Sequence, residues 1–484
     1  MLKKAMTTPM LPGVYLSAPK ILFILLVIAF SLIMVFLGSK SLWLDEANAL
    51  HIAHIGQEAL WAGNSELYHP PLFYWFLEIW ERIGSSEFIL RFPGVIFGTI
   101  TIYGIYVLAK DLFGHPVALS AASIATFSPL LVWYAQDMRP YALLCLLGLM
   151  VIIASFKLFL TPRIHWWLLF VTSMASGLYL HYFAILLLPL QLGLLAVMLA
   201  LRRAKGIAII FMLLGWGAVT LIYWPWLQTP AATKFLKRVT SGNNDIFHVL
   251  ADRLNIVIDM ANFTNGFALG VGVLLGGGGL WGLYRLFRSE RIRTSLLSLR
   301  TKKWIQVTLL VLFLGLLVAS VIPRGYTIKR QLVILWPYAI LAFAWFWPWQ
   351  KSNYIWLLNL LIISLIGSLI NILIIPKPQW REATAFIRNN HQTNDLVVLE
   401  PHYYTITYDF YEKSDMSRMG IPFNLPDSKL DGLLNSHDRV WLVVHGTDPH
   451  TQNQAKAWLD KKANLINVTD YFRLQVRLYH LPDK

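Results

Sequence analysis

Runs of about 20 apolar residues, nearly free of charge, recur along the first 376 positions of the chain. A bilayer core of about 30 Å is crossed by a helix of roughly 20 apolar residues. Residues 164–201 contain no Asp, Glu, Lys or Arg and are too long for one span, so we divide them at 180–182. The pattern predicts eleven membrane-spanning helices. They lie near residues 21–38, 88–109, 116–135, 140–156, 164–180, 183–201, 206–226, 263–284, 304–322, 331–348 and 353–375.

The pattern changes after residue 376. Residues 379–390 have the period of an amphipathic helix, and a second helix is expected at 451–462. Apolar strands are expected at 396–399 and 439–445, and residues 472–478 alternate apolar and polar side chains as a half-buried strand does. Strands that alternate with helices indicate a small α/β domain. The predicted fold is therefore a polytopic α-helical membrane domain, residues 1–376, followed by an α/β domain, residues 377–484.

Composition agrees with a membrane protein. Only 14% of the residues are charged, against about 25% in ordinary soluble domains. Lys and Arg number 41 and Asp and Glu 26, a formal charge of +15. Residues 377–484 hold 13 basic and 13 acidic side chains, so the whole excess belongs to residues 1–376. A charge placed among apolar helices indicates membrane topology, and no nucleic acid partner is expected. One cysteine, Cys145, excludes an internal disulfide and a cysteine-based zinc cluster.

Basic residues occur at alternate connections between the expected helices. The positive-inside rule places such connections in the cytoplasm. The N-terminus is then cytoplasmic. Because the number of spans is odd, residues 377–484 are expected on the non-cytoplasmic side of the cell (inner) membrane. The first apolar run lacks a small-residue cleavage site, so we expect a retained anchor. The connections contain Lys3, Lys4, Lys20, Lys110, Lys157, Arg163, Arg202, Arg203, Lys205, Arg285, Arg288, Arg291, Arg293, Arg300, Lys302 and Lys303.

Four outward connections carry polar residues that are costly near a membrane. Residues 41–47 contain Asp45 and Glu46, and residues 68–75 contain His69 before a stretch too short and too charged to cross the bilayer. That stretch is expected to lie in the interface as an amphipathic helix. The other two are residues 134–141 and residues 324–330.

Each of these residues also has an ordinary structural interpretation. A lone loop acid is more often solvated than catalytic, and a lone histidine is more often a hydrogen-bonded interface residue than a ligand. Arg139 could simply pair with Asp137, and the outward cations could bind lipid headgroups. The functional interpretation is favoured because acids and cations recur on one face, and because the cations before the tenth span oppose the positive-inside trend. Those cations are Arg324, Lys329 and Arg330.

A carboxylate and several cations at a membrane surface suit transfer of a group from a lipid phosphate. Arg stabilises the leaving phosphate through paired hydrogen bonds, and Asp can take the proton of the incoming hydroxyl. The chain has no GxxxxGK[ST], HExxH or GxSxG motif, and no GxGxxG after a strand.

Several short motifs, taken in order, resemble the bacterial GT-C membrane glycosyltransferases. These are the family 39-like enzymes, related to protein O-mannosyltransferases and to lipid A aminoarabinose transferases. The resemblance covers nearly the whole chain. The motifs are residues 43–47 (WLDEA), 69–72 (HPPL), 91–93 (RFP), 136–141 (QDMRPY), 180–183 (LHYF), Lys329-Arg330 and 380–383 (WREA).

The resemblance implies an inverting transfer of a sugar from a polyprenyl-phosphate donor to an acceptor on the non-cytoplasmic face. The acceptor is a hydroxyl of a lipid, glycan or protein, and membrane lipid is a second partner. Asp45 matches the family's first-loop aspartate, the expected general base or acceptor-orienting residue, and Asp137 matches its second acidic position. Glu46 is grouped with these two acids as catalytic. The expected substrate-binding residues are His69, Arg139, Tyr141, His181, Tyr182, Arg324, Lys329 and Arg330.

One departure concerns sugar identity. Aminoarabinose transferases carry an acid and a lysine before the proline, where this chain has Tyr68 and His69. The identity of the sugar is therefore not carried over. Metal dependence varies among the relatives, so a divalent ion stays open, and no cofactor is predicted.

Two other classes of protein compete with the enzyme. A lipid-linked sugar translocase or transporter also needs many spans, but transporters place their polar residues near the bilayer midplane and show repeated halves. Here the acids gather at one edge and no repeat is visible. A non-catalytic scaffold would leave the one-sided set of acids and cations without a role.

Overall fold

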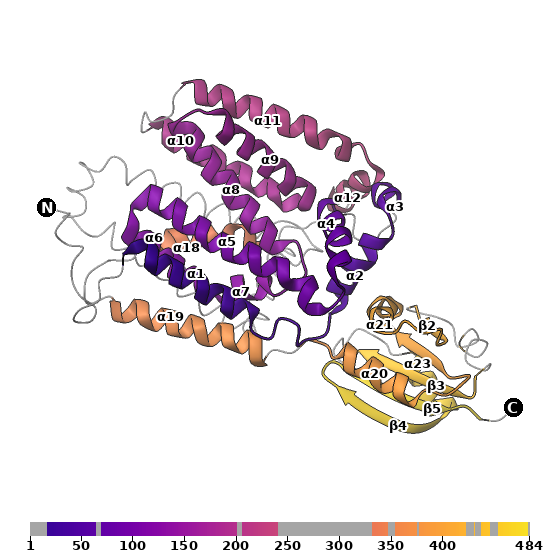
Figure 1. Cartoon of the computed structure of the whole chain (residues 1–484). Helices are drawn as coiled ribbons and strands as arrows, with labels where there is room; N and C mark the ends of the chain where they lie inside the picture. Colours follow the sequence, from indigo (N-terminus) through magenta and orange to yellow (C-terminus); the bar gives the residue numbers. More distant parts are fainter. Residues whose placement is uncertain are drawn as a thin grey trace, which may run out of the picture. The chain divides into compact units, whose positions relative to one another are not determined.

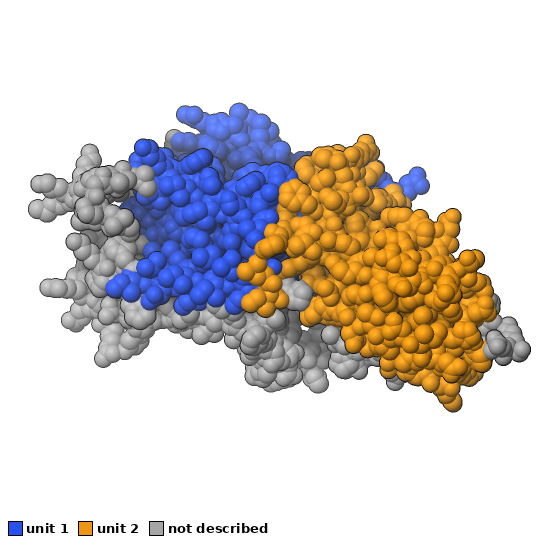
Figure 2. All heavy atoms as spheres, turned by 60° about the horizontal axis from the view of Figure 1, so that its bottom comes forward, with its two compact units in different colours: residues 1–35, 57–73, 91–372 blue, residues 36–56, 74–90, 373–484 orange. Residues whose placement is uncertain are grey.

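The computed structural model describes residues 17–63, 69–200, 206–240, 332–346, 354–374, 377–422, 430, 437–445 and 454–482. The chain forms two compact units (Figure 2). Unit 1 consists of Met1–Val35, Gln57–Phe73 and Arg91–Ile372. Unit 2 consists of Phe36–Gly56, Tyr74–Leu90 and Leu373–Lys484, so it joins pieces of the chain that are far apart in sequence.

Unit 1 is helical throughout its described residues. Among its helices, α8, α9, α10 and α11 lie side by side (Figure 1). The α-helices are α1 (Ala18–Met34), α3 (Gln57–Ala62), α5 (Glu87–Phe113, whose first turn belongs to unit 2), α6 (His115–Thr126), α7 (Pro129–Ala135), α8 (Tyr141–Leu160), α9 (Ile164–Leu180), α10 (Leu187–Ala200), α11 (Gly206–Leu227), α12 (Pro230–Thr240), α18 (Trp336–Phe346) and α19 (Tyr354–Leu369). Shorter turns are the 3-10 helices η3 (Tyr182–Leu186) and η4 (Leu332–Leu335) and the π-helix η6 (Ile370–Ile374).

The helices of unit 1 have the surface of a membrane protein. Four helices in the described part of the chain are long and apolar enough to cross a bilayer, and a bent pair makes a fifth. On α11, Leu213 is 68% exposed and Leu221 76% exposed. Large apolar side chains on a helix are stable in that position when lipid surrounds them. The prediction of a membrane protein is therefore confirmed, whereas the expected spans 263–284 and 304–322 lie outside the described residues.

The expected span 116–135 is not one straight helix. It is divided into α6 and α7, whose axes differ by 58°. Pro129 opens α7 and has no backbone N–H to continue α6, while the Ser128 hydroxyl accepts the N–H of Leu131 at 3.5 Å. The bend separates α7 as a short helix that ends just before residue 136.

The described residues of unit 2 form a five-stranded sheet in the order β2-β1-β3-β5-β4. Strand β1 pairs in parallel with β2 and β3, and β5 pairs antiparallel with β3 and β4. The strands are β1 (Leu396–Glu400), β2 (Arg418–Gly420), β3 (Arg439–His445), β4 (Asn464–Tyr471) and β5 (Leu474–His480), and the helices of the sheet region are α20 (Trp380–Asn390), α21 (Thr405–Tyr411) and α23 (Gln454–Lys462).

Most of the expected elements of this region are present, with some differences. The alternating strand begins at Leu474 and not at Phe472, which lies in the turn between β4 and β5. Strands β2 and β4 and helix α21 were not expected. Strand β4 is an edge strand whose residues are mostly exposed on both faces, so it lacks the alternation that identifies a half-buried strand.

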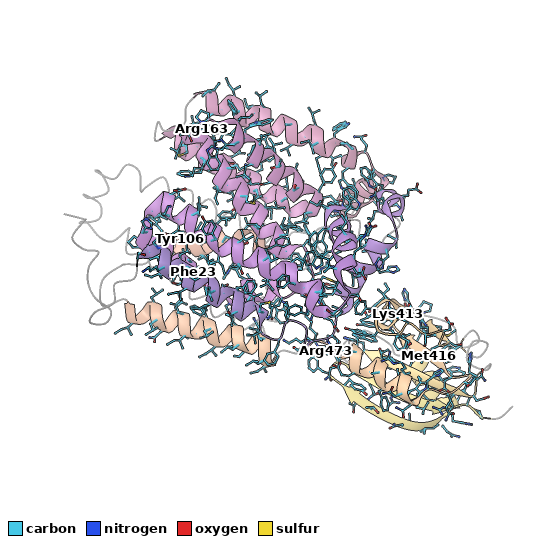
Figure 3. All side chains as sticks on the ribbon, viewed as in Figure 1. Phe23, Tyr106, Arg163, Lys413, Met416 and Arg473 are labelled. Carbon is cyan, nitrogen blue, oxygen red and sulfur yellow. The ribbon has the colours of Figure 1, made fainter. Side chains whose placement is uncertain are left out.

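The central strands β1 and β3 are buried on both faces of the sheet. Val397 and Leu399 of β1 lie in one apolar cluster with α20, and Leu396 and Val398 lie in another with α23. A strand with two buried faces reads as a continuous apolar run, which explains its sequence, LVVLE. Met416, labelled in Figure 3, belongs to the first cluster.

Segments of residues 39–87, which the sequence predicts to form the first outward connection, belong to unit 2. They include α2 (Leu44–His54), most of α4 (Leu72–Trp80) and the 3-10 turn η2 (Glu81–Ile83). Leu44 packs against the apolar cluster of the sheet. The candidate acids Asp45 and Glu46 are thus part of the same compact unit as the α/β sheet.

Candidate active site

The turn that carries Asp137 and Arg139 is set by a close contact between helices. Gly94 and Gly98 of α5 face Ala135, the last residue of α7. A Cβ at Gly94 would overlap the carbonyl oxygen of Ala135, and one at Gly98 would lie 2.8 Å from its Cβ. Small residues four positions apart let helices in a membrane approach each other closely. The glycines therefore fix the point from which residues 136–140 leave α7.

Gln136 holds the same turn from the other side. Its side-chain amide donates to the carbonyl oxygens of Ile33, at 2.8 Å, and Val35, at 2.9 Å. The last carbonyls of a helix have no partner within the helix, and here the amide of Gln136 satisfies the end of α1. Within the turn, the N–H of Arg139 donates to the Asp137 carbonyl oxygen at 2.8 Å.

Four of the expected substrate-binding residues come together beside this turn. The rings of His69 and His181 have centroids 5.2 Å apart, and those of Tyr141 and His181 are 6.1 Å apart. The guanidinium of Arg139 lies 5.9 Å from the centre of the Tyr141 ring, a cation–π contact. Arg139 is 8% exposed and His181 3% exposed. We call His69, Arg139, Tyr141 and His181 the His-Arg cluster.

The His181 ring is neutral. It lies in the break between α9 and η3, where burial, together with nearby His69 and Arg139, holds its pKa well below the usual value of 6.5. Its Nδ1 accepts the N–H of Phe183 at 3.2 Å. A neutral imidazole carries one proton, so Nε2 holds it and is a hydrogen-bond donor.

Tyr182 belongs to a different group of side chains. Its ring is stacked on that of Phe235 with centroids 3.7 Å apart. Its hydroxyl accepts the indole N–H of Trp226 at 3.3 Å. The expected role of Tyr182 in substrate binding therefore stays a proposal, and its contacts differ from those of the His-Arg cluster.

Asp137, the second expected acid, is 4% exposed. A charged group so deeply buried requires compensation by the surrounding protein. The three cations expected near the donor phosphate, Arg324, Lys329 and Arg330, lie outside the described residues.

In unit 2, Asp45 and Glu46 stand in the first turn of α2 and have different surroundings. Glu46 is fully buried, whereas Asp45 is partly exposed. One carboxylate oxygen of Glu46 accepts from Lys377 Nζ at 3.0 Å, and the other accepts the N–H of Trp43 at 3.3 Å. Acids in the first turn also interact favourably with the helix dipole. Of the two neighbouring acids, Asp45 has the more accessible side chain.

Possible metal ligands can be compared only among the residues that the structure describes. In the described ranges, no group of three or more His, Cys, Asp or Glu side chains is arranged to hold an ion. What the site offers is hydrogen-bond donors and positive charge in a poorly hydrated place. Such groups stabilise the negative charge that develops on a leaving phosphate.

Some residues of this arrangement were missed by sequence reasoning. Gln136 belongs to the motif at residues 136–141, but nothing in the sequence shows that its amide reaches the end of α1. Lys377 and Glu46 are paired although they lie 331 positions apart in the chain. A pair so distant leaves no periodic signal in one sequence.

Comparisons with known proteins give one family match and several solved structures of similar fold. Residues 68–227 match the family model described as dolichyl-phosphate-mannose-protein mannosyltransferase. That range contains the whole His-Arg cluster. No curated protein matches the sequence significantly.

Solved structures share the fold at low identity. The Archaeoglobus fulgidus oligosaccharyltransferase in complex with Zn and sulfate is 12% identical, with a TM-score of 0.57 over 92% of this chain and 71% of that one. The archaeal oligosaccharyltransferase AglB of the same organism, in complex with an inhibitory peptide and a dolichol-phosphate, is 11% identical, with a TM-score of 0.55 over 88% and 69%. ArnT from Cupriavidus metallidurans is 15% identical, with a TM-score of 0.49 over 95% and 97%.

The family match includes the helices that carry the His-Arg cluster, and the shared fold extends over most of the chain. Together they show that the chain shares the fold of the Archaeoglobus fulgidus oligosaccharyltransferase, and that residues 68–227 resemble the mannosyltransferase model.

Proposed function

We propose that the protein transfers a sugar from a polyprenyl-phosphate donor to a hydroxyl acceptor on the non-cytoplasmic face of the membrane. The observation that carries this proposal is the His-Arg cluster, which gathers a buried cation and two imidazoles within the residues that match the mannosyltransferase model. A related fold in complex with a dolichol-phosphate supports the class of donor.

Arg139 is assigned as the residue that binds the phosphate of the sugar donor. His69 and His181 are assigned as further hydrogen-bond donors to that phosphate. A guanidinium binds phosphate through two parallel hydrogen bonds and keeps its charge at any working pH. The Nε2–H of neutral His181 donates without adding a second buried charge. Tyr141, against which Arg139 packs, limits the directions that the guanidinium can take. Arg324, Lys329 and Arg330 are proposed as additional phosphate contacts, and Tyr182 as a contact to the substrate.

Asp45 is proposed as the general base. Its carboxylate takes the proton of the acceptor hydroxyl, and the hydroxyl oxygen attacks the anomeric carbon from the face opposite the phosphate. The bond between the anomeric carbon and the phosphate oxygen breaks, its electron pair leaves with the polyprenyl phosphate, and the anomeric configuration is inverted. Asp137 is proposed as a second acid that orients the sugar hydroxyls. Glu46, given a catalytic role from the sequence, has both carboxylate oxygens engaged by protein groups.

The experiment compares wild type with Asp45→Asn in nanodiscs. It uses a panel of radiolabelled undecaprenyl-phosphate sugars as donors and cell-envelope lipids, glycans and proteins as acceptors. Loss of a general base lowers kcat by about 10²- to 10⁴-fold. Binding of undecaprenyl phosphate itself is expected to stay unchanged.

Asp111→Asn is the matched control. Asp111 lies near the end of α5 and pairs with Lys157 at 2.7 Å, so it is expected to retain full activity. A folded Asp45→Asn variant that turns over at the wild-type rate would remove the base assignment. Movement of the lipid-linked sugar across vesicles without sugar transfer would favour the translocase.

The proposal includes a topology, a domain boundary and the absence of a cofactor. The protein is multi-pass in the cell (inner) membrane, with a cytoplasmic N-terminus, residues 1–376 in the membrane and residues 377–484 outside. Protease added to intact spheroplasts should cleave beyond residue 376, and protection there would reverse the topology. Activity should survive dialysis against EDTA, and recovery only after Zn²⁺, Mg²⁺ or Mn²⁺ is added back would introduce a metal.

A further inference from the structure

Glu46 is a fully buried acid that directly follows the proposed base, Asp45, in the chain. Its carboxylate has no exposed surface and accepts from an ammonium and from a backbone N–H. A buried carboxylate is stable only when its charge is paired and its oxygens are hydrogen-bonded. The contacts of Glu46 meet both conditions, so this residue has a structural explanation that does not involve the substrate.

Lys377 supplies the pairing charge from the start of the α/β region. Its side chain is 9% exposed, and its ammonium lies 3.0 Å from Glu46 Oε1 and 5.9 Å from the centre of the Trp43 ring. Trp43 and Glu46 are the residues on either side of Leu44 and Asp45. One lysine therefore contacts both flanks of the segment that bears the proposed base.

A second set of contacts holds the residues just before this segment. The N–H of Leu42 donates to the Tyr411 hydroxyl at 2.6 Å, and that hydroxyl donates to Glu87 at 2.9 Å. The Ser41 hydroxyl donates to Glu382 at 3.0 Å.

Arg381 joins these contacts to one another. Its guanidinium pairs with Glu87 at 2.8 Å, and its backbone N–H donates to the Ser41 hydroxyl at 3.2 Å. Residues of α20 and α21 in the sheet region thus bind the segment of chain that leads into α2.

We propose that Lys377, through its ion pair with Glu46, is a positioning residue that fixes the Asp45 carboxylate at the start of α2. The proposal rests on the assignment of Asp45 as the base. It gives the α/β region a direct part in catalysis, because the region supplies the charge that holds the catalytic segment. Glu46 then serves as the anchor, and Asp45 alone of the two acids performs the chemistry.

The test replaces Lys377 by Met, which keeps the length of the side chain and removes the charge. A displacement of about 1 Å at a catalytic group can cost about 10²-fold in rate. We expect kcat of Lys377→Met to fall by about that factor, while KM for the donor and the affinity for undecaprenyl phosphate stay unchanged. Hydrogen exchange of the N–H groups of residues 43–47 should become faster.

Two further variants separate positioning from general loss of stability. Lys377→Arg restores a cation that can reach Glu46, so it should recover most of kcat. Lys456→Met removes a lysine from an exposed ion pair with Asp460 of the same sheet region, and should leave kcat and exchange at residues 43–47 unchanged. Equal effects of Lys377→Met and Lys456→Met would overturn the proposal.

The outcomes also separate this proposal from the function on which it rests. If Asp45→Asn retains wild-type activity, the base assignment fails. If Asp45→Asn is inactive but folded Lys377→Met turns over at the wild-type rate, the base assignment stands and the role of Lys377 is wrong. Unchanged exchange at residues 43–47 in Lys377→Met would also contradict positioning, whatever the activity.

Discussion

The two units hold their candidate residues by different means. In unit 1, Arg139 and His181 are packed against aromatic rings, and the turn before Arg139 is placed by glycines on a neighbouring helix. In unit 2, Asp45 lies in a segment bound by ion pairs and hydrogen bonds, among them the contact of Lys377 with Glu46. Helices in lipid gain little from apolar burial and depend on close packing. A water-exposed α/β region can use charged side chains, because water solvates those that are not buried.

This difference teaches where a substitution should act. Changes to size and shape are expected to matter most in unit 1, and changes to charge beside Asp45 are expected to matter most in unit 2. The predictions below test that division, beginning with the largest expected effect.

Arg139→Met should have the largest effect in unit 1. It removes the cation assigned to the donor phosphate, and loss of one such charge-stabilising donor costs about 10²- to 10³-fold in kcat. Arg139→Lys keeps the charge but lacks the planar guanidinium. Its kcat should lie between those of wild type and Arg139→Met. Steady-state kinetics with an undecaprenyl-phosphate sugar measure both. Arg163→Met is the control, since Arg163 is exposed at the start of α9 (Figure 3). Wild-type kinetics in Arg139→Met would move the phosphate site elsewhere.

Gly94→Ala tests the packing of the turn. The added methyl group overlaps the carbonyl oxygen of Ala135, and overpacking of this kind costs about 1–3 kcal/mol. Displacement of residues 136–139 should also lower kcat, about tenfold. Gly217→Ala on α11 is the matched control, because nothing lies within 4 Å of a Cβ there. If both variants unfold at the same temperature and have the same kcat, the helix contact does not position the turn.

His181 should make the protein sensitive to acid. Its folded pKa lies below 6.5 because of burial and the neighbouring His69 and Arg139, so the unfolded chain binds this proton more readily. Stability is then lost as the pH falls below about 6.5, because the folded state must take up this proton at a lower pH than the unfolded chain does. The unfolding temperature of His181→Gln should fall less between pH 7.5 and 5.5 than that of wild type. His165→Gln, at an exposed site, should follow wild type, and identical slopes in all three proteins would contradict a neutral His181.

Asp460→Asn should have the smallest effect. Asp460 pairs with Arg477 at 2.8 Å, with side chains 38% and 14% exposed, and an ion pair that water reaches on one side is expected to contribute about 1 kcal/mol. The variant should unfold slightly more easily and keep the wild-type kcat. A clear loss of kcat would show that charges throughout unit 2 affect the chemistry, and would weaken the distinction between Lys377 and the remaining ion pairs.

Much of the local structure could be predicted from particular stretches of sequence. Residues 439–445 form the expected strand, and the helix expected at 379–390 is α20. Strand β4 could not be predicted, because an edge strand exposed on both faces has no apolar period. The bend between α6 and α7 follows from Ser128-Pro129. The apolar run over residues 116–135 is nevertheless continuous, so it predicts a single helix.

The candidate site was only partly readable. Asp137, Arg139 and Tyr141 are near neighbours in the chain, so their proximity follows from the sequence. His69 and His181 are 112 positions apart, and their ring contact depends on how the helices of unit 1 pack. The resemblance distinguishes Asp45 from Glu46, but their different burial, and the pairing of Glu46 with Lys377, arise only in the folded protein.

The sequence by itself determined the class of this protein: apolar runs of membrane length, a neutral α/β region, and acids and cations gathered on the connections between the runs. These properties follow from composition and period, which are local and need no knowledge of long-range contacts. The tertiary structure decided which residues meet and which carboxylate is enclosed. Burial and ion pairing depend on segments distant in the chain. In an unfolded chain the carboxylates of Asp45 and Glu46 would therefore have equivalent surroundings. In the folded protein Glu46 is enclosed and paired with Lys377, whereas Asp45 is partly exposed.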